Sequence, residues 1–146
     1  MMRKVILVLI CLLCFLGIEA RERRVLKSDL PKRAINFLDE FYKQSQVSCW
    51  KEGRYLGIKY EINLDNGTTL EFDRQGRLGS IDCGPGEFVP LEILPDELRD
   101  FITLEYSGRK VTEYSIDNRG TRYEEHEIEF LGGFEITIKG KYNNRY

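Results

Sequence analysis

The stretch YEINLDNGTTLEF, residues 60–72, has the pattern of a β-hairpin. Apolar and polar side chains alternate over residues 60–64 and again over 68–73, as they do in strands that bury one face. Between these segments, Asp65-Asn66-Gly67 predicts a tight type I′ turn, because Asn-Gly readily adopts positive φ angles. The stretch therefore predicts two antiparallel strands that cover a core on one side.

The same pattern returns 66 residues later in HEIEFLGGFEITI, residues 126–138. Upstream of each hairpin a second motif repeats with an offset of 64, so that Leu30-Pro31 returns as Leu94-Pro95. Apolar residues at spacings of three and four follow both prolines and predict an amphipathic helix in each copy. Each copy alone would be only marginally stable, because small domains bury little surface. The sequence thus predicts an α+β fold, a tandem repeat of a helix plus an antiparallel β-meander, whose two copies share an interface.

Further boundaries follow from the same pattern. Ser28 and Asp29 are expected to cap the first helix, with Pro31 and Pro95 in the first turns of the two helices. The linker between the copies is Cys83–Ile93, which is rich in glycine and proline. The remaining predicted strands are Val47–Lys51, Tyr55–Leu64, Arg77–Asp82, Tyr123–Leu131 and Phe134–Lys139, with a short or frayed last strand at Tyr142–Tyr146.

The first twenty residues have the features of a secretory signal peptide. Arg3 and Lys4 precede an unbroken apolar run, Val5–Leu16, that is too short to span a bilayer comfortably. Cleavage is expected after Ala20, and an uncleaved anchor is the alternative. We expect a periplasmic or secreted protein, with no stable membrane insertion after cleavage. Its expected parts are the signal peptide (1–20), a first copy (21–83), and the linker plus a second copy (84–146).

Two cysteines, Cys49 and Cys83, lie in the part that would be exported. Export permits a disulfide between them, and such a bridge would add roughly 3–4 kcal/mol in the chain-entropy model. The alternative is two separate thiols, because a bridge requires the Cα atoms to come close.

The 146 residues include 22 basic and 24 acidic ones, a net charge of −2. This balance argues against a strongly basic nucleic-acid binder. The charge is uneven, since residues 21–83 carry a net +2 and residues 84–146 a net −5. Glu125, Glu127 and Glu129 fall on one face of a predicted strand, with Glu135 beside them. This face could receive a cationic peptide or weakly hold calcium, or be an ordinary solvated surface.

Aromatic residues suggest a second candidate surface. Trp50 and Tyr114 occupy equivalent repeat positions, each opposite in parity to the valine three residues before it. If the valines face the helices, these aromatics face the open side of the sheet. With Tyr55 and Tyr123 they could form a contact patch of the residue types enriched at binding hot spots. The alternative is packing against the other copy or the linker.

Residues suited to catalysis are sparse. The one histidine, His126, occupies the repeat position of Tyr60, and a structural place at the rim of the core explains both. No serine or cysteine stands in a nucleophile-elbow pattern, and no glycine-rich loop is suited to cradling phosphate. We therefore predict no catalytic residue, no cofactor and no metal site.

Residues 28–82 and 92–146 resemble exported PepSY-like, beta-lactamase-inhibitor-like proteins of Gram-negative bacteria. The resemblance rests on the strand–turn–strand segments Tyr60–Gly67, Leu70–Asp73 and Gly76–Leu78. It implies an α+β fold with an antiparallel sheet, no catalytic residues, and roles in binding or inhibiting other exported proteins. The second copy departs from the pattern, with Gly132-Gly133 at the turn and Lys139 in place of Asp73.

The resulting prediction is a non-enzymatic exported module that binds an unknown exported or envelope protein, as an inhibitor or regulator of an envelope enzyme, and binds no nucleic acid. The alternative is a periplasmic protein that binds a small ligand or calcium on the acidic face of the second copy.

Overall fold

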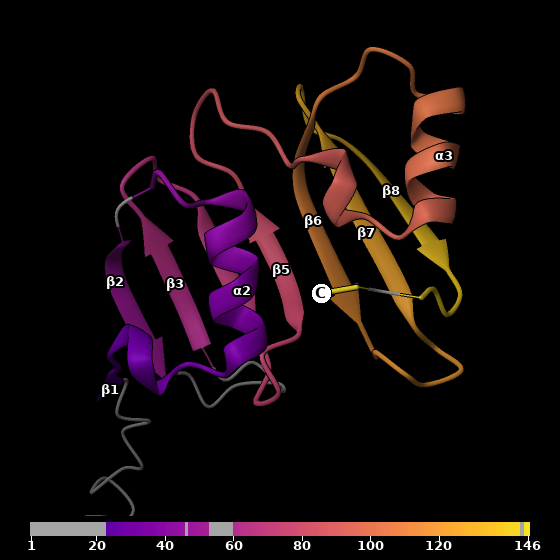
Figure 1. Cartoon of the computed structure of the whole chain (residues 1–146). Helices are drawn as coiled ribbons and strands as arrows, with labels where there is room; N and C mark the ends of the chain where they lie inside the picture. Colours follow the sequence, from indigo (N-terminus) through magenta and orange to yellow (C-terminus); the bar gives the residue numbers. More distant parts are fainter. Residues whose placement is uncertain (1–22, 46, 53–59, 144) are drawn as a thin grey trace, which may run out of the picture.

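One antiparallel sheet of eight strands runs through the computed structural model, with the strands in chain order (Figure 1). The structure describes residues 23–45, 47–52, 60–143 and 145–146. The strands are β1 (Arg23–Arg24), β2 (Val47–Glu52), β3 (Tyr60–Leu64), β4 (Thr69–Phe72), β5 (Leu78–Asp82), β6 (Val111–Asp117), β7 (Glu125–Phe130) and β8 (Phe134–Lys139).

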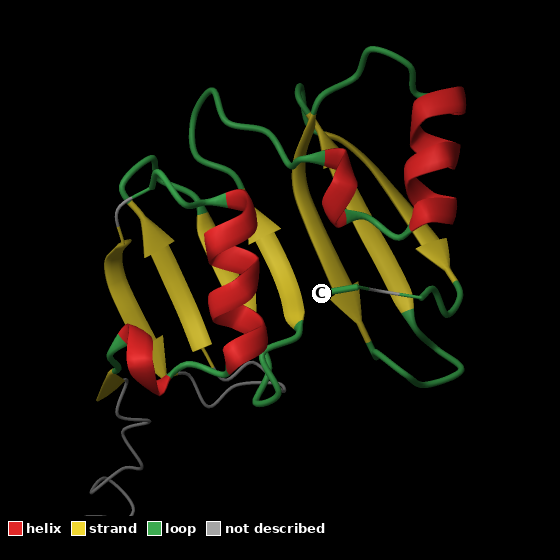
Figure 2. Ribbon diagram, viewed as in Figure 1, coloured by secondary structure: helices red, strands yellow, loops and turns green. Residues whose placement is uncertain are grey.

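Two α-helices lie on the same side of this sheet, α2 (Lys32–Phe41) and α3 (Asp96–Glu105) (Figure 2). Each is preceded by a 3₁₀ turn, η1 (Lys27–Asp29) or η2 (Leu91–Ile93), and then by a proline. The prolines stand at the N-cap positions, one residue before the predicted first turns. The predicted cap is wrong, because Asp29 belongs to η1 and its carboxylate accepts the N–H of Leu26 at 3.2 Å instead.

The repeat read from the sequence is confirmed element by element. The bounds of α3 are those of α2 plus 64, and η2 follows η1 with the same offset. The register irregularity of β2, between Val47 and Cys49, also returns 64 residues later in β6, between Val111 and Glu113. The prediction of an α+β fold, a tandem repeat of a helix plus an antiparallel meander, is therefore confirmed.

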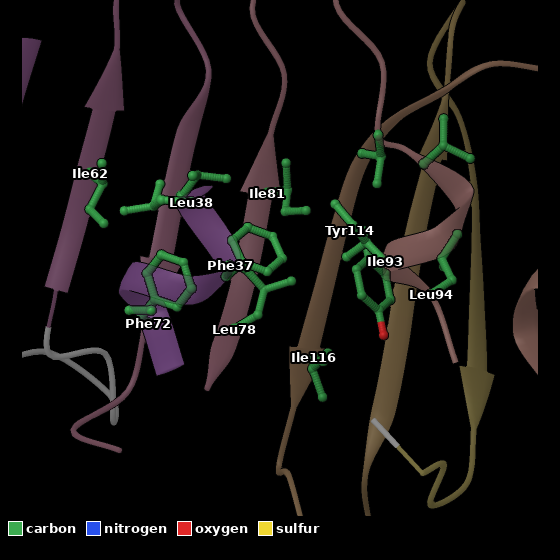
Figure 3. Packing of buried hydrophobic residues seen from close by; sticks show 14 of the residues in the cluster. Phe37, Leu38, Ile62, Phe72, Leu78, Ile81, Ile93, Leu94, Tyr114 and Ile116 are labelled. Atoms are coloured by element: carbon green, nitrogen blue, oxygen red, sulfur yellow. The ribbon is translucent and has the colours of Figure 1, made fainter. Parts of the chain in front are cut away.

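A single hydrophobic core spans both copies (Figure 3). The copies join where β5 pairs with β6, and Ile81 lies opposite Tyr114 there. Both side chains are fully buried, as are Phe37 of α2 and Ile93 of η2. The predicted shared interface is thus a continuous sheet with one core under two helices.

The hairpin turns differ in one detail from the prediction. Gly67 has a φ of +85°, but Asn66 has no positive φ, so the first turn is not type I′. Instead Leu64 accepts the N–H of Gly67 at 3.2 Å and donates its own N–H to Thr68 at 2.9 Å, which makes a three-residue loop. Among the strands, β7 begins at Glu125 rather than Tyr123. The predicted strand Tyr55–Leu64 is observed from Tyr60 onwards as β3, and its first five residues lie outside the described residues.

The C-terminal segment forms no strand in its described residues and crosses towards the first copy instead. The ring of Tyr146 lies edge-on to Phe37 and Phe41 of α2, with centroid distances of 5.4 and 5.1 Å. Arg33 donates to the carbonyl of Arg145 at 2.7 Å. Arg145 and Tyr146, which were predicted to belong to a short or frayed last strand, therefore connect α2 to the second copy.

Of the two alternatives for Cys49 and Cys83, the structure favours separate thiols over a disulfide. Cys49 lies in β2, while Cys83 directly follows β5, and two strands separate them. At about 4.8 Å per strand, three steps separate them by roughly 14 Å, twice the reach of a disulfide. Cys83 is a free thiol, and burial, aided by Asp82 and Glu87, raises its pKa to about 12.

Gly84 lets the linker pass closely over the first hairpin turn. A Cβ at this position would lie 2.1 Å from the Asn66 carbonyl oxygen. We expect Gly84→Ala to lower the free energy of unfolding by about 1–3 kcal/mol, as overpacking does. Gly79→Ala is the matched control, because its Cβ would meet nothing closer than 3.4 Å. Urea denaturation of both variants checks this, and equal stabilities would contradict it.

Candidate functional site: the open face of the sheet

The side of the sheet opposite the helices carries mainly acidic residues, and no described element covers it (Figure 2). We call it the acidic face. Glu125, Glu127 and Glu129 lie on it as predicted, alternating along β7 with buried residues. The other carboxylates that the strand register places there are Glu61, Glu71, Asp82, Glu113, Asp117 and Glu135.

Four of these carboxylates form one row across neighbouring strands. Asp82 lies opposite Glu113, Glu113 opposite Glu129, and Glu129 opposite Glu135. Paired residues have Cα atoms only about 4.5–5.5 Å apart, so like charges in such pairs repel. Burial and the carboxylates of Asp82, Glu129, Glu135 and Glu127 raise the pKa of Glu113. We call these four residues the carboxylate row.

Positive charge is scarce around the carboxylate row. Among the described residues of β5–β8, Lys139 is the one lysine or arginine, and its ammonium group lies 3.0 Å from the Glu125 carboxylate. Ser80 donates to Glu71 at 2.7 Å in the neighbouring row. The carboxylate row therefore creates a negative electrostatic potential near the centre of the sheet and at its β8 edge.

The predicted aromatic patch does not form as expected. Tyr114 is fully buried on the helix side, in the core (Figure 3). The prediction was wrong because the register shift between Val111 and Glu113 inserts one residue and reverses the parity of the strand. Trp50 lies opposite Ile62 in the backbone register, and Tyr55 lies outside the described residues. Tyr123 is exposed, in the turn before β7.

A buried polar network in the second copy escaped the sequence analysis. The hydroxyl of Tyr114 lies 2.8 Å from Nδ1 of His126, and Nε2 of His126 lies 3.1 Å from the Glu124 carboxylate. Burial lowers the pKa of His126 despite Glu124. Burial alone would raise the pKa of Glu124, but hydrogen bonds from Gly120, His126 and Tyr142 lower it overall. A neutral imidazole therefore donates from Nε2 to Glu124 and accepts at Nδ1 from Tyr114.

This network is a structural device that is closed to solvent. His126 is 0% exposed and is deeper than the rim position predicted for it. The ring of Tyr142 lies edge-on to the imidazole at 5.0 Å, and the Tyr142 N–H donates to Glu124 at 3.4 Å. The network thus fixes the start of the C-terminal segment against β6 and β7.

No set of three or more His, Cys, Asp and Glu side chains suited to a metal ion occurs in the described part of the chain.

A pocket of about 220 Å³ beside the start of α3 is lined mainly by Glu92, Asp96, Glu97 and Arg145. No described helix has the length and apolar character needed to cross a membrane.

A protein-family model described as "Putative beta-lactamase-inhibitor-like, PepSY-like" matches residues 16–80 and again 58–144. The chain belongs to this PepSY-like family. The two overlapping matches agree with the internal repeat of this PepSY-like chain. A search among curated proteins found no match.

Solved structures with the same fold come from Bacteroides. A periplasmic protein of the DUF2874 family from Bacteroides vulgatus has a TM-score of 0.74 at 22% identity, over 89% of this chain and 98% of its own. A protein from Bacteroides thetaiotaomicron, described as "putative calcium-regulated periplasmic", has a TM-score of 0.71 at 24% identity, over 86% and 94%. A second B. vulgatus periplasmic protein, of unknown function, has 0.68 at 22%, over 85% and 98%. The predicted localisation agrees with these neighbours.

Tyr114→Phe tests the buried network of this PepSY-like chain. The change removes the hydroxyl and leaves Nδ1 of His126 buried without its donor, so we expect the free energy of unfolding to fall by about 1–3 kcal/mol. Tyr106→Phe is the control, because that ring stacks on Phe130 while its hydroxyl makes no hydrogen bond to the described residues. Chemical denaturation at neutral pH measures both, and a Tyr114→Phe protein as stable as the control would contradict the assignment.

Glu113→Gln tests the repulsion in the carboxylate row. A raised folded-state pKa means that stability is lost as the pH rises through it, so neutralising Glu113 should stabilise the protein at pH 7 by up to about 1 kcal/mol. The gain should disappear below about pH 4, where the carboxyl is protonated in both states. Glu125→Gln, which loses the pair with Lys139, should show no such gain. Thermal unfolding across pH distinguishes these outcomes.

Proposed function

We propose that this protein is a non-enzymatic, exported binding module whose acidic face docks on a basic surface of another envelope protein. The carboxylate row carries the proposal. Four aligned carboxylates repel one another, and this repulsion adds to burial in raising the pKa of Glu113. A partner that brings lysine or arginine side chains to the row would relieve this repulsion, which favours association with a basic surface.

The architecture supports a protein partner rather than a small neutral one. The face is a broad sheet surface whose rows lie in regular register, and the helices and core hold it from behind. The family description points the same way, because a beta-lactamase inhibitor acts by binding another exported protein. Inhibition or regulation of an envelope enzyme is the outcome of docking that we propose.

The absence of catalysis is part of the proposal. His126 is the one histidine of the chain, and both of its ring nitrogens are engaged inside the core. Cys83 is a thiol with a pKa of about 12, far above the range in which a cysteine acts as a nucleophile. Neither His126 nor Cys83 is therefore suited to catalysis.

The test is capture of envelope proteins by the protein exported with its own leader, followed by measured affinity for the captured partner. Asp82→Asn, Glu113→Gln and Glu129→Gln together should weaken that affinity at least about tenfold, and wild-type binding should weaken with added salt. Glu92→Gln, Glu97→Gln and Glu105→Gln remove the same charge from exposed positions around α3 and should bind as wild type. Equal affinity of the two triple variants would overturn the proposal.

Calcium binding on the acidic face is a second candidate. The similarity to a structure described as "putative calcium-regulated" favours it. Calcium takes six to eight oxygen ligands in a compact shell, whereas the carboxylate row is an extended line across four strands, and no group of three or more side chains suited to a metal ion occurs in the described part of the chain. Calorimetric titration of the full chain with calcium decides this: heat and a thermal shift that the row variant lacks would support it, and neither at millimolar calcium would reject it.

A further inference from the structure

Besides the acidic face, the fold has a second surface that is open to a binding partner, the outer edge of β8. β8 is the last strand of the sheet, and β7 is its one neighbour among the described residues. Its counterpart in the first copy, β4, has strands on both sides, β3 and β5. The residues that could supply a matching strand for β8 lie instead against α2, where Tyr146 contacts Phe37 and Phe41.

The hydrogen bonds that flank β8 show which of its backbone groups face outwards. Gly140 donates its N–H to the carbonyl of Glu124 at 3.0 Å, and Gly133 donates to Phe130 at 2.9 Å. Hydrogen-bonded and non-hydrogen-bonded pairs alternate along an antiparallel ladder. The backbone groups of Ile136 and Ile138 therefore point to β7, and those of Glu135, Thr137 and Lys139 point away from the sheet.

This edge carries two charged side chains, Glu135 and Lys139, but lacks the other common protections against pairing. Its six residues contain no proline, and their register with β7 is uninterrupted from Phe134 to Lys139. Natural edge strands are commonly shortened, bulged or made strongly charged. The opposite edge of the sheet, β1, has two residues, and both are arginine.

Two copies of this edge are complementary to each other. In an antiparallel pair centred on Thr137, Glu135 lies opposite Lys139 of the partner subunit, and Ile136 lies opposite Ile138 of the partner subunit. Phe134, 43% exposed, then lies opposite Gly140 of the partner subunit, which has no side chain to obstruct it. Centring on Glu135 would instead set two glutamates against each other, which is unfavourable.

We propose that β8 pairs with β8 of a second copy about a two-fold axis at Thr137, which joins two eight-stranded sheets into one. An antiparallel two-fold edge contact of this kind is self-complementary. Other exposed apolar side chains of the second copy are Leu131, in the turn that leads into β8, and Phe101 and Leu104 of α3. Pairing would also place both acidic faces on one side of the joined sheet.

Sedimentation velocity of the full-length protein, over a wide concentration range, provides the first test. We expect a concentration-dependent dimer that Thr137→Pro dissociates, because proline removes an outward N–H and leaves the pairing with β7 intact. Circular dichroism and thermal unfolding check that this variant folds. A wild-type protein that stays monomeric up to its solubility limit would overturn the proposal, as would a dimer that persists in folded Thr137→Pro protein.

Charge exchange provides the second test and does not depend on proline. Glu135→Lys and Lys139→Glu each create two like-charged pairs in the dimer, and each should raise the dissociation constant at least about tenfold. Mixing these two variants should restore a one-to-one dimer, because every pair across the axis is then of opposite charge. Glu97→Lys, on the exposed side of α3, is the control for altered net charge. Single variants that dimerise like the control, or a mixture that does not associate, would overturn the proposal.

Discussion

The pairing of β5 with β6 is the contact on which the rest of the molecule depends. It joins two repeats, each of a size that is only marginally stable alone, through Ser80–Ser115, Ile81–Tyr114 and Asp82–Glu113. The alternation of a strand gives this short ladder two functions. Ile81 and Tyr114 seal the core on the helix side, and Asp82 and Glu113 begin the carboxylate row on the other side. The same short ladder therefore contributes to both the core and the charged surface.

Sequence periodicity predicted the elements well because the repeat checks itself. One apolar stripe is weak evidence for a helix, whereas the same stripe recurring 64 residues later is strong evidence. The bounds of α2 and α3 keep that offset. The errors came from the irregular parts. A one-residue bulge has no clear sequence signature, yet it reverses the face of every residue beyond it, which is why Tyr114 was placed on the wrong side. Asp82 and Glu113 were missed because their proximity depends on strand pairing between copies.

The separation of the two cysteines, which the sequence left open, has the same kind of cause. Cys49 and Cys83 lie in one repeat and suit an exported protein, but strand order decides distance, and two strands stand between them. Similarly, Glu124 has no distinguishing neighbours in the sequence. Its role follows from the position of His126 in the core, since a buried imidazole needs a partner at each nitrogen, and Glu124 and Tyr114 are within reach.

The path of the described C-terminal residues explains why the two ends of the sheet differ. A strand formed by these residues beside β8 would leave α2 without the Tyr146 contact. The tail instead stabilises the first copy, through Phe37, Phe41 and Arg33, and β8 stays open in the described fold. The C-terminal residues cannot contact α2 and pair with β8 at the same time, so their contact with α2 leaves the edge of β8 unpaired in the described fold. An edge that is left open by the construction of the fold, yet carries a glutamate and a lysine symmetrically around Thr137, is better suited to pairing than to solvent.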